Sequence, residues 1–148
     1  MIKETLRSLF KRDLTKLKEE IELYHTDSAI WAVEGGIANS AGNLCLHLIG
    51  NLNTFIGAVL GNTGYIRQRE LEFSLKDIPR HELINKIENT IDMIDEVLIN
   101  LKEEQFDAEY PIIVFESKMS TEYFLIHLAT HLSYHLGQVN YHRRLLDK

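Results

Sequence analysis

The most constraining feature of this sequence is a run of apolar residues at helical spacing that begins after Asp77. The apolar positions recur at steps of three or four and are Leu83, Ile87, Ile91, Ile94, Leu98 and Leu101. This period places them on one face of a helix of about six turns. Pro79 favours a helix start at the beginning of the run. The run predicts a long amphipathic helix that must bury one side against other elements.

Three further segments carry the same pattern. They cover residues 2–24, 40–61 and 120–146. Ser40 and Ser120 stand where each of the later two segments begins and are suitable N-cap residues. Four long amphipathic helices predict an all-α protein with the architecture of a four-helix bundle.

Two long connections separate these helices. Residues 61–78 show no sustained period and are expected to form an ordered loop, which in compact domains is often functional. In the second connection, the β-branched run Ile112-Ile113-Val114 suggests a brief extended piece, too isolated to found a sheet. No repeat, low-complexity tract or flexible linker divides the chain, so a single domain over residues 1–148 is expected.

Charge and composition exclude several classes of function. The net charge of −6 is spread along the chain without a basic stripe, which argues against binding nucleic acid. One cysteine, Cys45, suits a reducing compartment. The N-terminus does not resemble a signal peptide, and we expect no run long enough to span a membrane. The sequence therefore predicts a cytoplasmic protein.

The main chemical signal is the pair His131 and His135 in the segment predicted as the last helix. Four residues on a helix turn through about 400° and rise about 6 Å, so both imidazoles can reach one metal ion. His47, between Asn43 and Asn51 in the second helix, can face this pair across a bundle. Three histidines would hold zinc or nickel, with iron or manganese as alternatives, and leave one position open for water or substrate.

Other residues of the last helix extend this pattern. His127 and His142 continue the stripe of histidines on the same face. His127, Asn51 and Gln138 are candidates for contacts that orient the three ligands from behind. His127 can also be read as a substitute ligand.

Three other metal or nucleophile patterns fit less well. The HExxH motif of zinc peptidases needs a glutamate where Leu132 stands. Glu22 and His25 form one ExxH run, but a di-iron bundle needs a second. Cys45 lies about 200° around the helix from His47 and is expected to be a packing residue.

Residues that would line a substrate pocket can also be named. The aromatic candidates are Trp31, Tyr65, Phe73 and Tyr134, for which ordinary core packing is the alternative. Arg67 and Arg69 in the first connection would hold an anionic cofactor or a substrate carboxylate, or else form a solvated surface. Glu34 and Glu70 are the carboxylates to consider as general bases, with a surface role preferred for both.

The segment Ser40–Asn53, together with the run His131-x-x-x-His135-Leu136-Gly137-Gln138, resembles the DinB-like superfamily, which includes bacillithiol and mycothiol transferases. The resemblance covers nearly the whole chain. It implies a four-helix bundle of the DinB/YfiT-like type and a divalent metal on three histidines, which map onto His47, His131 and His135. It also implies a homodimer and a low-molecular-weight thiol cofactor, with transferase or hydrolase chemistry on a small-molecule substrate.

The resemblance has one visible departure. Relatives often carry a basic residue after the last ligand, where this chain has Leu136.

Apolar residues beyond one stripe, Leu9 beside Phe10 and Val97 beside Leu98, are candidates for either the core or a dimer surface. Three hypotheses remain open: a metal-dependent enzyme, a metal-binding protein with a structural or sensing role, and a bundle without metal whose histidines pair in the core.

Overall fold

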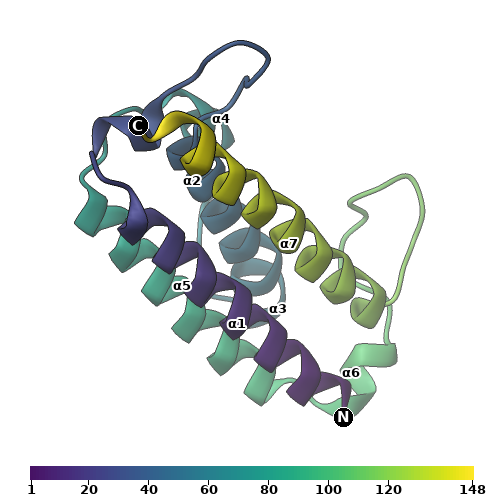
Figure 1. Cartoon of the computed structure of the whole chain (residues 1–148). Helices are drawn as coiled ribbons and strands as arrows, with labels where there is room; N and C mark the ends of the chain where they lie inside the picture. The colour runs from purple at the N-terminus through teal and green to yellow at the C-terminus, as the bar shows by residue number, and fades with distance from the viewer.

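In the computed structural model, which describes every residue from Met1 to Lys148, four long helical segments run side by side (Figure 1). The segments are α1 (Ile2–Leu23), α2 (Ala41–Leu52) with its continuations η2 (Asn53–Ala58) and α3 (Val59–Gly61), α5 (Arg80–Asn100), and α7 (Thr121–Leu146). Both α1 and α2 pack against α5 and against α7, so the four segments enclose one core. The chain forms no β-strand, and the expectation of an all-α protein is confirmed.

The direction of the helices explains why the connections are long. In Figure 1, α1 and α7 run toward the end of the molecule that holds the C-terminus, while α2 and α5 run the other way. Because α2 and α5 point in the same direction, residues 62–79 must return along the whole length of the helices. The segment does so as an ordered chain, as expected, and passes over α2 on the way.

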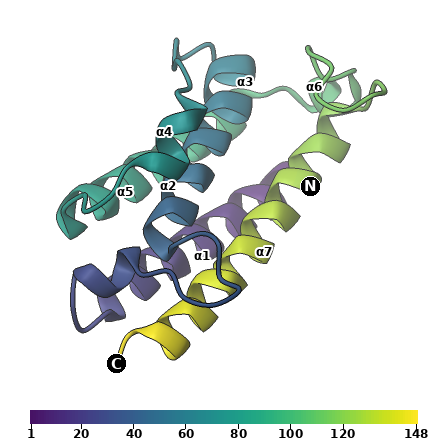
Figure 2. The same cartoon turned by 90° about the horizontal axis from the view of Figure 1, so that it is seen from above.

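Three short helices lie in the connections: η1 (Ser28–Trp31), α4 (Arg69–Ser74) and α6 (Glu103–Asp107). The ordered connection expected over residues 61–78 contains a helix, α4, that the sequence pattern did not indicate. A helix of six residues completes fewer than two turns and gives no apolar period to detect. Contacts with α2 hold α4 in place, and Figure 2 shows the two helices next to each other.

No β-strand forms at Ile112, where the sequence suggested a brief extended piece. The chain instead makes a single antiparallel bridge between Glu109 and Ser120, which closes the base of the loop before α7. Ile112 and Ile113 stand 45% and 63% exposed at the far end of that loop. β-Branched residues need a partner strand to form a ladder, and no such strand is near them.

The predicted helix starts are confirmed at two serines. Ser40 accepts a hydrogen bond from the backbone N–H of Asn43, and Ser120 accepts one from that of Tyr123. Pro79 is the residue before the first turn of α5 instead of the first residue inside it.

The second helical segment forms the centre of the molecule, and every residue of α2 is buried. With its continuation to Gly61 it has 21 residues, and its most apolar window of 18 residues has a mean hydropathy of 1.5, so by length and composition alone it could cross a membrane. The expectation that no run reaches this length was therefore wrong. However, 61% of the most apolar window is buried against the rest of the fold, as in the core helices of soluble proteins.

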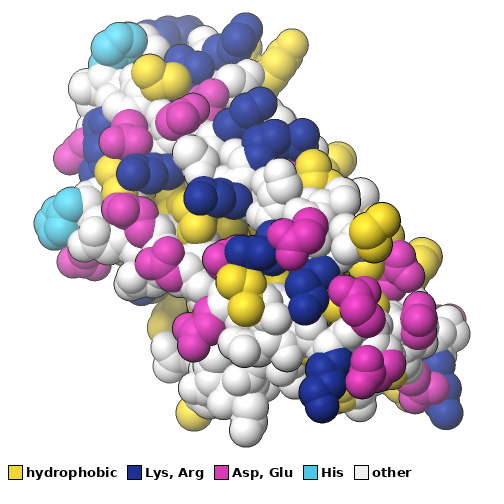
Figure 3. All heavy atoms as spheres, turned by 90° about the horizontal axis from the view of Figure 1, so that it is seen from below, with side chains coloured by type: hydrophobic (Ala, Val, Ile, Leu, Met, Phe, Trp, Pro, Cys, Tyr) yellow, Lys and Arg dark blue, Asp and Glu magenta, His cyan; other side chains and the backbone are white.

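The outer surface mixes both signs of charge. Figure 3 shows Lys and Arg side chains interleaved with Asp and Glu over the visible face, and ion pairs such as Arg7 with Asp95 link α1 to α5. The apolar residues suggested for a partner surface belong mainly to the core, because Phe10, Val97 and Leu98 are at most 8% exposed. The exposed apolar residues of α7 are Tyr123, Ile126, Tyr134, Tyr141 and Leu145.

Candidate metal centre

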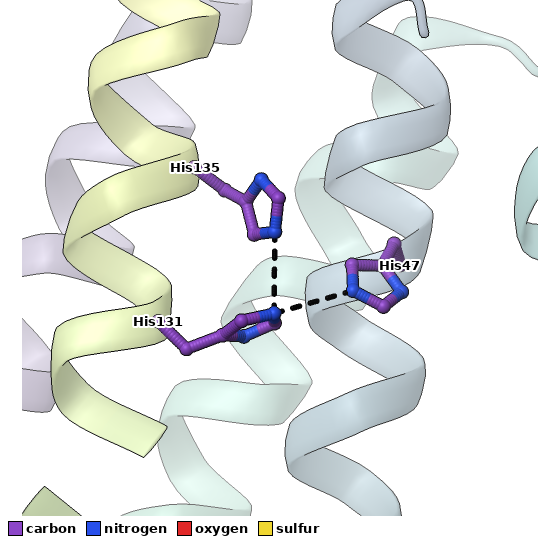
Figure 4. Close-up of side chains that lie close together, drawn as sticks. All are labelled: His47, His131 and His135. Atoms are coloured by element: carbon purple, nitrogen blue, oxygen red, sulfur yellow. Dashed lines mark hydrogen bonds between the residues drawn. The ribbon is translucent and has the colours of Figure 1, made fainter. Parts of the chain in front are cut away.

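Three histidines converge between α2 and α7 (Figure 4). Nε2 of His131 lies 3.4 Å from Nε2 of His47 and 3.2 Å from Nε2 of His135. Nitrogen ligands of a tetrahedral ion, each about 2.05 Å from the metal, are about 3.3 Å from one another. Two of the three nitrogen–nitrogen distances therefore match the edges of a tetrahedral site, and all three ligand atoms lie within 4.8 Å of one another.

The opposite ring nitrogens of two of these histidines are held by side-chain oxygens. Nδ1 of His47 lies 3.1 Å from Oε1 of Glu72, and Nδ1 of His135 lies 2.7 Å from Oε1 of Gln138. An oxygen acceptor places the proton on Nδ1, so Nε2 of each neutral ring carries a free lone pair directed at the cluster. This is the arrangement in which metal-binding histidines are usually oriented.

The surroundings keep the rings of His47 and His131 neutral. Burial lowers the pKa of His131 to about 4, and repulsion from His135 and His47 adds to the effect. Burial also lowers the pKa of His47, although the contact with Glu72 partly offsets it. Near neutral pH both imidazoles are thus in the form that binds metals.

Glu72 contacts the candidate metal centre and was not among the residues that the sequence singled out. Its carboxylate is buried and receives hydrogen bonds from Arg67 at 2.8 and 3.0 Å, besides its contact with His47. Glu70, the neighbour considered from the sequence, is exposed, as is Glu34. The short helix α4 offers no period from which to decide which of its two glutamates points inward.

The position of Glu72 depends on how α4 is attached to α2. The side-chain amide of Asn43 donates hydrogen bonds of 2.9 Å to the backbone carbonyls of Glu72 and Leu75. The side chain of Glu72 lies over Gly50, where a Cβ atom would overlap the carboxylate. Asn43 and Gly50 therefore set the distance at which Glu72 approaches His47.

The remaining candidate residues differ in how they lie relative to the three converging histidines. Asn51 is 8% exposed, and its Oδ1 is buried without a hydrogen-bond partner. His127 stacks 6.3 Å from His131, ring centre to ring centre, and is not part of the group of converging nitrogen atoms. His142 lies away from the cluster, where it bonds to Tyr24 and to the carbonyl of Ala32.

A cavity of about 260 Å³ lies on one side of the histidines, and we call it the arginine cavity. Arg67 and Arg69 line it together with Asn51, His127, His47 and His131. The rest of its wall is apolar and includes Phe55 and Phe115. Both predicted arginines thus border the space that the candidate ligands face.

A second cavity of about 530 Å³ borders His135 on another side, and we call it the tyrosine cavity. Tyr134, Tyr141 and Gln138 line it, with apolar residues from the chain between η1 and α2. The candidate metal centre therefore has a cavity at His47 and His131 and another at His135.

The other predicted wall residues are spread over the fold. Phe73 packs its ring 5.0 Å from that of His47, centre to centre, and Tyr65 lines a separate groove beside α4. Trp31 belongs to the core, where its ring lies against Gly42.

Cys45 is a packing residue, as predicted from its direction on the helix. Its side chain is fully buried, and burial raises the pKa of its thiol to about 12. A thiol in this state is a poor nucleophile and a poor metal ligand at neutral pH.

Comparison with known proteins gives a family without an assigned activity. Residues 3–148 match a family model described as "Protein of unknown function (DUF1572)". No curated protein matches the sequence. Because the match spans almost the whole chain, this protein belongs to the DUF1572 family.

Proposed function

We propose that this chain is a metal-dependent enzyme built on a four-helix bundle of the DinB-like type, with one divalent ion held by His47, His131 and His135. The observation that carries the proposal is the convergence of three Nε2 atoms at 3.2 and 3.4 Å while side-chain oxygens occupy Nδ1 of His47 and His135. Two of those Nε2 atoms bear lone pairs and cannot donate to a neighbour.

A cation suits this group better than a set of hydrogen bonds. If Nε2 of His131 carries a proton, it can donate a full hydrogen bond to Nε2 of His47 or to Nε2 of His135, but not to both. Nδ1 of His131 is buried without a partner whether Nε2 carries a proton or binds an ion. A bound ion would accept all three lone pairs. Imidazole ligands favour zinc or nickel, with iron or manganese as alternatives.

The ion, when bound, would supply Lewis acidity and deprotonate a thiol or a water molecule near neutral pH. Other side chains of the protein orient the ligand histidines. Glu72 fixes the ring of His47, Gln138 fixes that of His135, and Arg67 balances the buried charge of Glu72. Since His127 lies outside the ligand group, the protein contributes three ligands and leaves a position open, which favours catalysis over a closed structural site.

Thiol transfer is the reaction we favour. A transferase must bind two reactants, and the two cavities beside the histidines offer separate places for them. The larger tyrosine cavity, lined by His135 and Gln138 as well as by apolar residues, suits the low-molecular-weight thiol that the resemblance to the bacillithiol and mycothiol transferases supports, and the arginine cavity suits a second, smaller reactant. Hydrolysis is the alternative, with water in the place of the thiol.

A transfer assay tests this proposal. The zinc- or nickel-loaded protein is incubated with bacillithiol, mycothiol or glutathione and a panel of electrophiles, and thiol loss is followed. We expect turnover with at least one thiol, loss of turnover in His135→Ala, and wild-type turnover in His81→Ala, which removes an exposed histidine from α5. Turnover that survives in His135→Ala would exclude the mechanism. Binding of metal without any turnover would instead favour a structural or sensing role.

We also propose that the protein forms a homodimer through Tyr123 and Ile126, which lie near the N-terminal end of α7. Tyr123 and Ile126 are 62% and 42% exposed and lie apart from both cavities. Sedimentation should give a dimer for the wild-type chain and a monomer for Ile126→Lys. A monomeric wild-type chain would contradict the proposal.

A further inference from the structure

The arginine cavity contains a polar side chain that has nothing to bind within the chain. Asn51 lines the cavity and is only 8% exposed. Its Oδ1 nevertheless has no hydrogen-bond partner. A buried carbonyl oxygen without a hydrogen bond costs about 1–3 kcal/mol. A ligand with an N–H or O–H group in the cavity would remove this cost.

The same cavity is lined by one cation, Arg69, that is exposed and has no counter-charge. Arg67 is paired with Glu72, so its charge is already balanced. Arg69 makes no ion pair, and its guanidinium group lies over the ring of Phe73 at 5.5 Å from the ring centre. One positive charge of the lining is therefore free to bind an anion, and guanidinium groups suit the two oxygens of a carboxylate.

The walls and the size of the cavity restrict the ligand further. Phe115 packs edge-on against His127 with 5.0 Å between ring centres, and Phe55 and Phe124 add aromatic surface. The volume of about 260 Å³ is below the range of about 300–1,000 Å³ that drug-sized molecules occupy. The cavity therefore suits a small molecule with an apolar or aromatic part.

We infer that the arginine cavity binds a small carboxylic acid that carries a hydroxyl or N–H group, with its carboxylate on Arg69 and its donor group on Oδ1 of Asn51. Because His47 and His131 line the same cavity, such a ligand would lie beside the proposed metal ion. The assignment of this ligand as a substrate rests on the proposed function. Its binding to the cavity does not, since neither Arg69 nor Asn51 is a proposed metal ligand.

Mandelate is a suitable probe because it combines a carboxylate, a hydroxyl group and an aromatic ring. Binding to the full-length protein is measured by calorimetry, first without metal, so that chelation of the ion by mandelate cannot contribute, and then with zinc. Mandelamide lacks the charge, and phenylacetate lacks the hydroxyl group. We expect mandelate to bind at least about tenfold more tightly than either, which corresponds to one charge-assisted or one buried hydrogen bond.

Two variants locate the binding. Arg69→Met should weaken mandelate binding about tenfold and abolish the preference over mandelamide. Asn51→Leu should abolish the preference over phenylacetate without lowering the melting temperature, because the replaced oxygen has no partner. Arg144→Met removes an exposed charge from α7 outside both cavities and should bind mandelate like the wild type.

The outcomes separate the two proposals. No mandelate binding, equal binding of mandelate and mandelamide, or unchanged binding by Arg69→Met would overturn the ligand assignment. The metal content of the same samples is measured independently. A protein that binds mandelate but no metal would refute the proposed function and leave the arginine cavity as an acid-binding site.

Discussion

Oε1 of Glu72, on the short helix α4, lies 3.1 Å from Nδ1 of His47 on α2. The carboxylate is buried and is also held by Arg67, so it cannot turn away from the imidazole at low cost. This contact decides which nitrogen of His47 faces His131 and His135. The geometry of the candidate metal centre therefore depends on a segment that lies outside the four long helices.

Replacing Glu72 should weaken metal binding without removing a ligand. Glu72→Gln keeps the size of the side chain but loses the charge that favours the proton on Nδ1 of His47. Loss of such an outer contact lowers metal affinity by about 10–100-fold, and we expect about tenfold because glutamine can still accept a hydrogen bond. Competition with a chromogenic chelator measures the affinity. Glu70→Gln, on the exposed side of α4, is the control and should match the wild type.

Gly50 offers a way to move Glu72 without changing it. A Cβ atom at Gly50 would overlap the carboxylate, so Gly50→Ala must displace Glu72 from His47. We expect a lower metal affinity and a loss of about 1–3 kcal/mol in the free energy of unfolding from overpacking. Chelator competition and urea unfolding measure the two effects. Wild-type affinity in Gly50→Ala would show that the contact between Glu72 and His47 is not needed.

The contact between η1 and α2 predicts a further loss of stability. Three ring atoms of Trp31 would lie 2.6–2.7 Å from a Cβ atom at Gly42. Gly42→Ala should therefore lower the free energy of unfolding by about 1–3 kcal/mol. Gly137 has no atom within 4 Å of such a Cβ, so Gly137→Ala in the helix α7 should raise it by about 0.5–1 kcal/mol. Equal unfolding midpoints for these two variants would contradict the packing described for Trp31.

Glu20 links α1 to α7 and makes the stability depend on pH. Burial acts to raise the pKa of Glu20, but hydrogen bonds from Arg143 and Asn140 outweigh it and bring the pKa below its usual value of 4.5. The folded state thus gains stability from ionised Glu20 above pH 4.5 and loses it as the pH falls through the lowered pKa.

Glu20→Gln should remove this contribution. At neutral pH we expect a loss of about 1–2 kcal/mol in the free energy of unfolding, since hydrogen bonds to a charged group are lost. The difference from the wild type should shrink in urea titrations below pH 4.5. Glu19→Gln, which changes an exposed glutamate without an ion pair, should unfold like the wild type at every pH. A difference that stays constant with pH would contradict the role of Glu20.

The sequence was sufficient for the long helices and for the three converging histidines. The helices and the pair His131 and His135 depend on local rules: the helical period, the serine N-caps, and the separation of four residues. The placement of His47 opposite that pair came from the geometry of a bundle and from the resemblance to the DinB-like superfamily. Glu72 and the arginine cavity could not be predicted because they depend on how a short helix folds back onto α2. The direction of that return is decided by contacts between distant residues, such as Asn43 with the backbone of Leu75.

His142 shows what helical spacing alone cannot predict. It falls on the same face of α7 as His135, but seven residues further along the helix, where Tyr24 and Ala32 take up both of its ring nitrogens. Helical spacing predicts the direction in which a side chain points, but it does not predict which residues lie opposite that side chain. The same limit applies to Trp31, which packs on Gly42 instead of lining a cavity.

The metal content of the purified protein tests the central proposal most directly. The chain is purified without a histidine tag or a chelator, loaded with zinc or nickel, dialysed, and analysed for metal by mass spectrometry. We predict one ion per chain for the wild type and for His81→Ala, and almost none for His131→Ala. A wild-type chain with far less than one ion, or a His131→Ala variant that retains as much metal as the wild type, would contradict the three-histidine site.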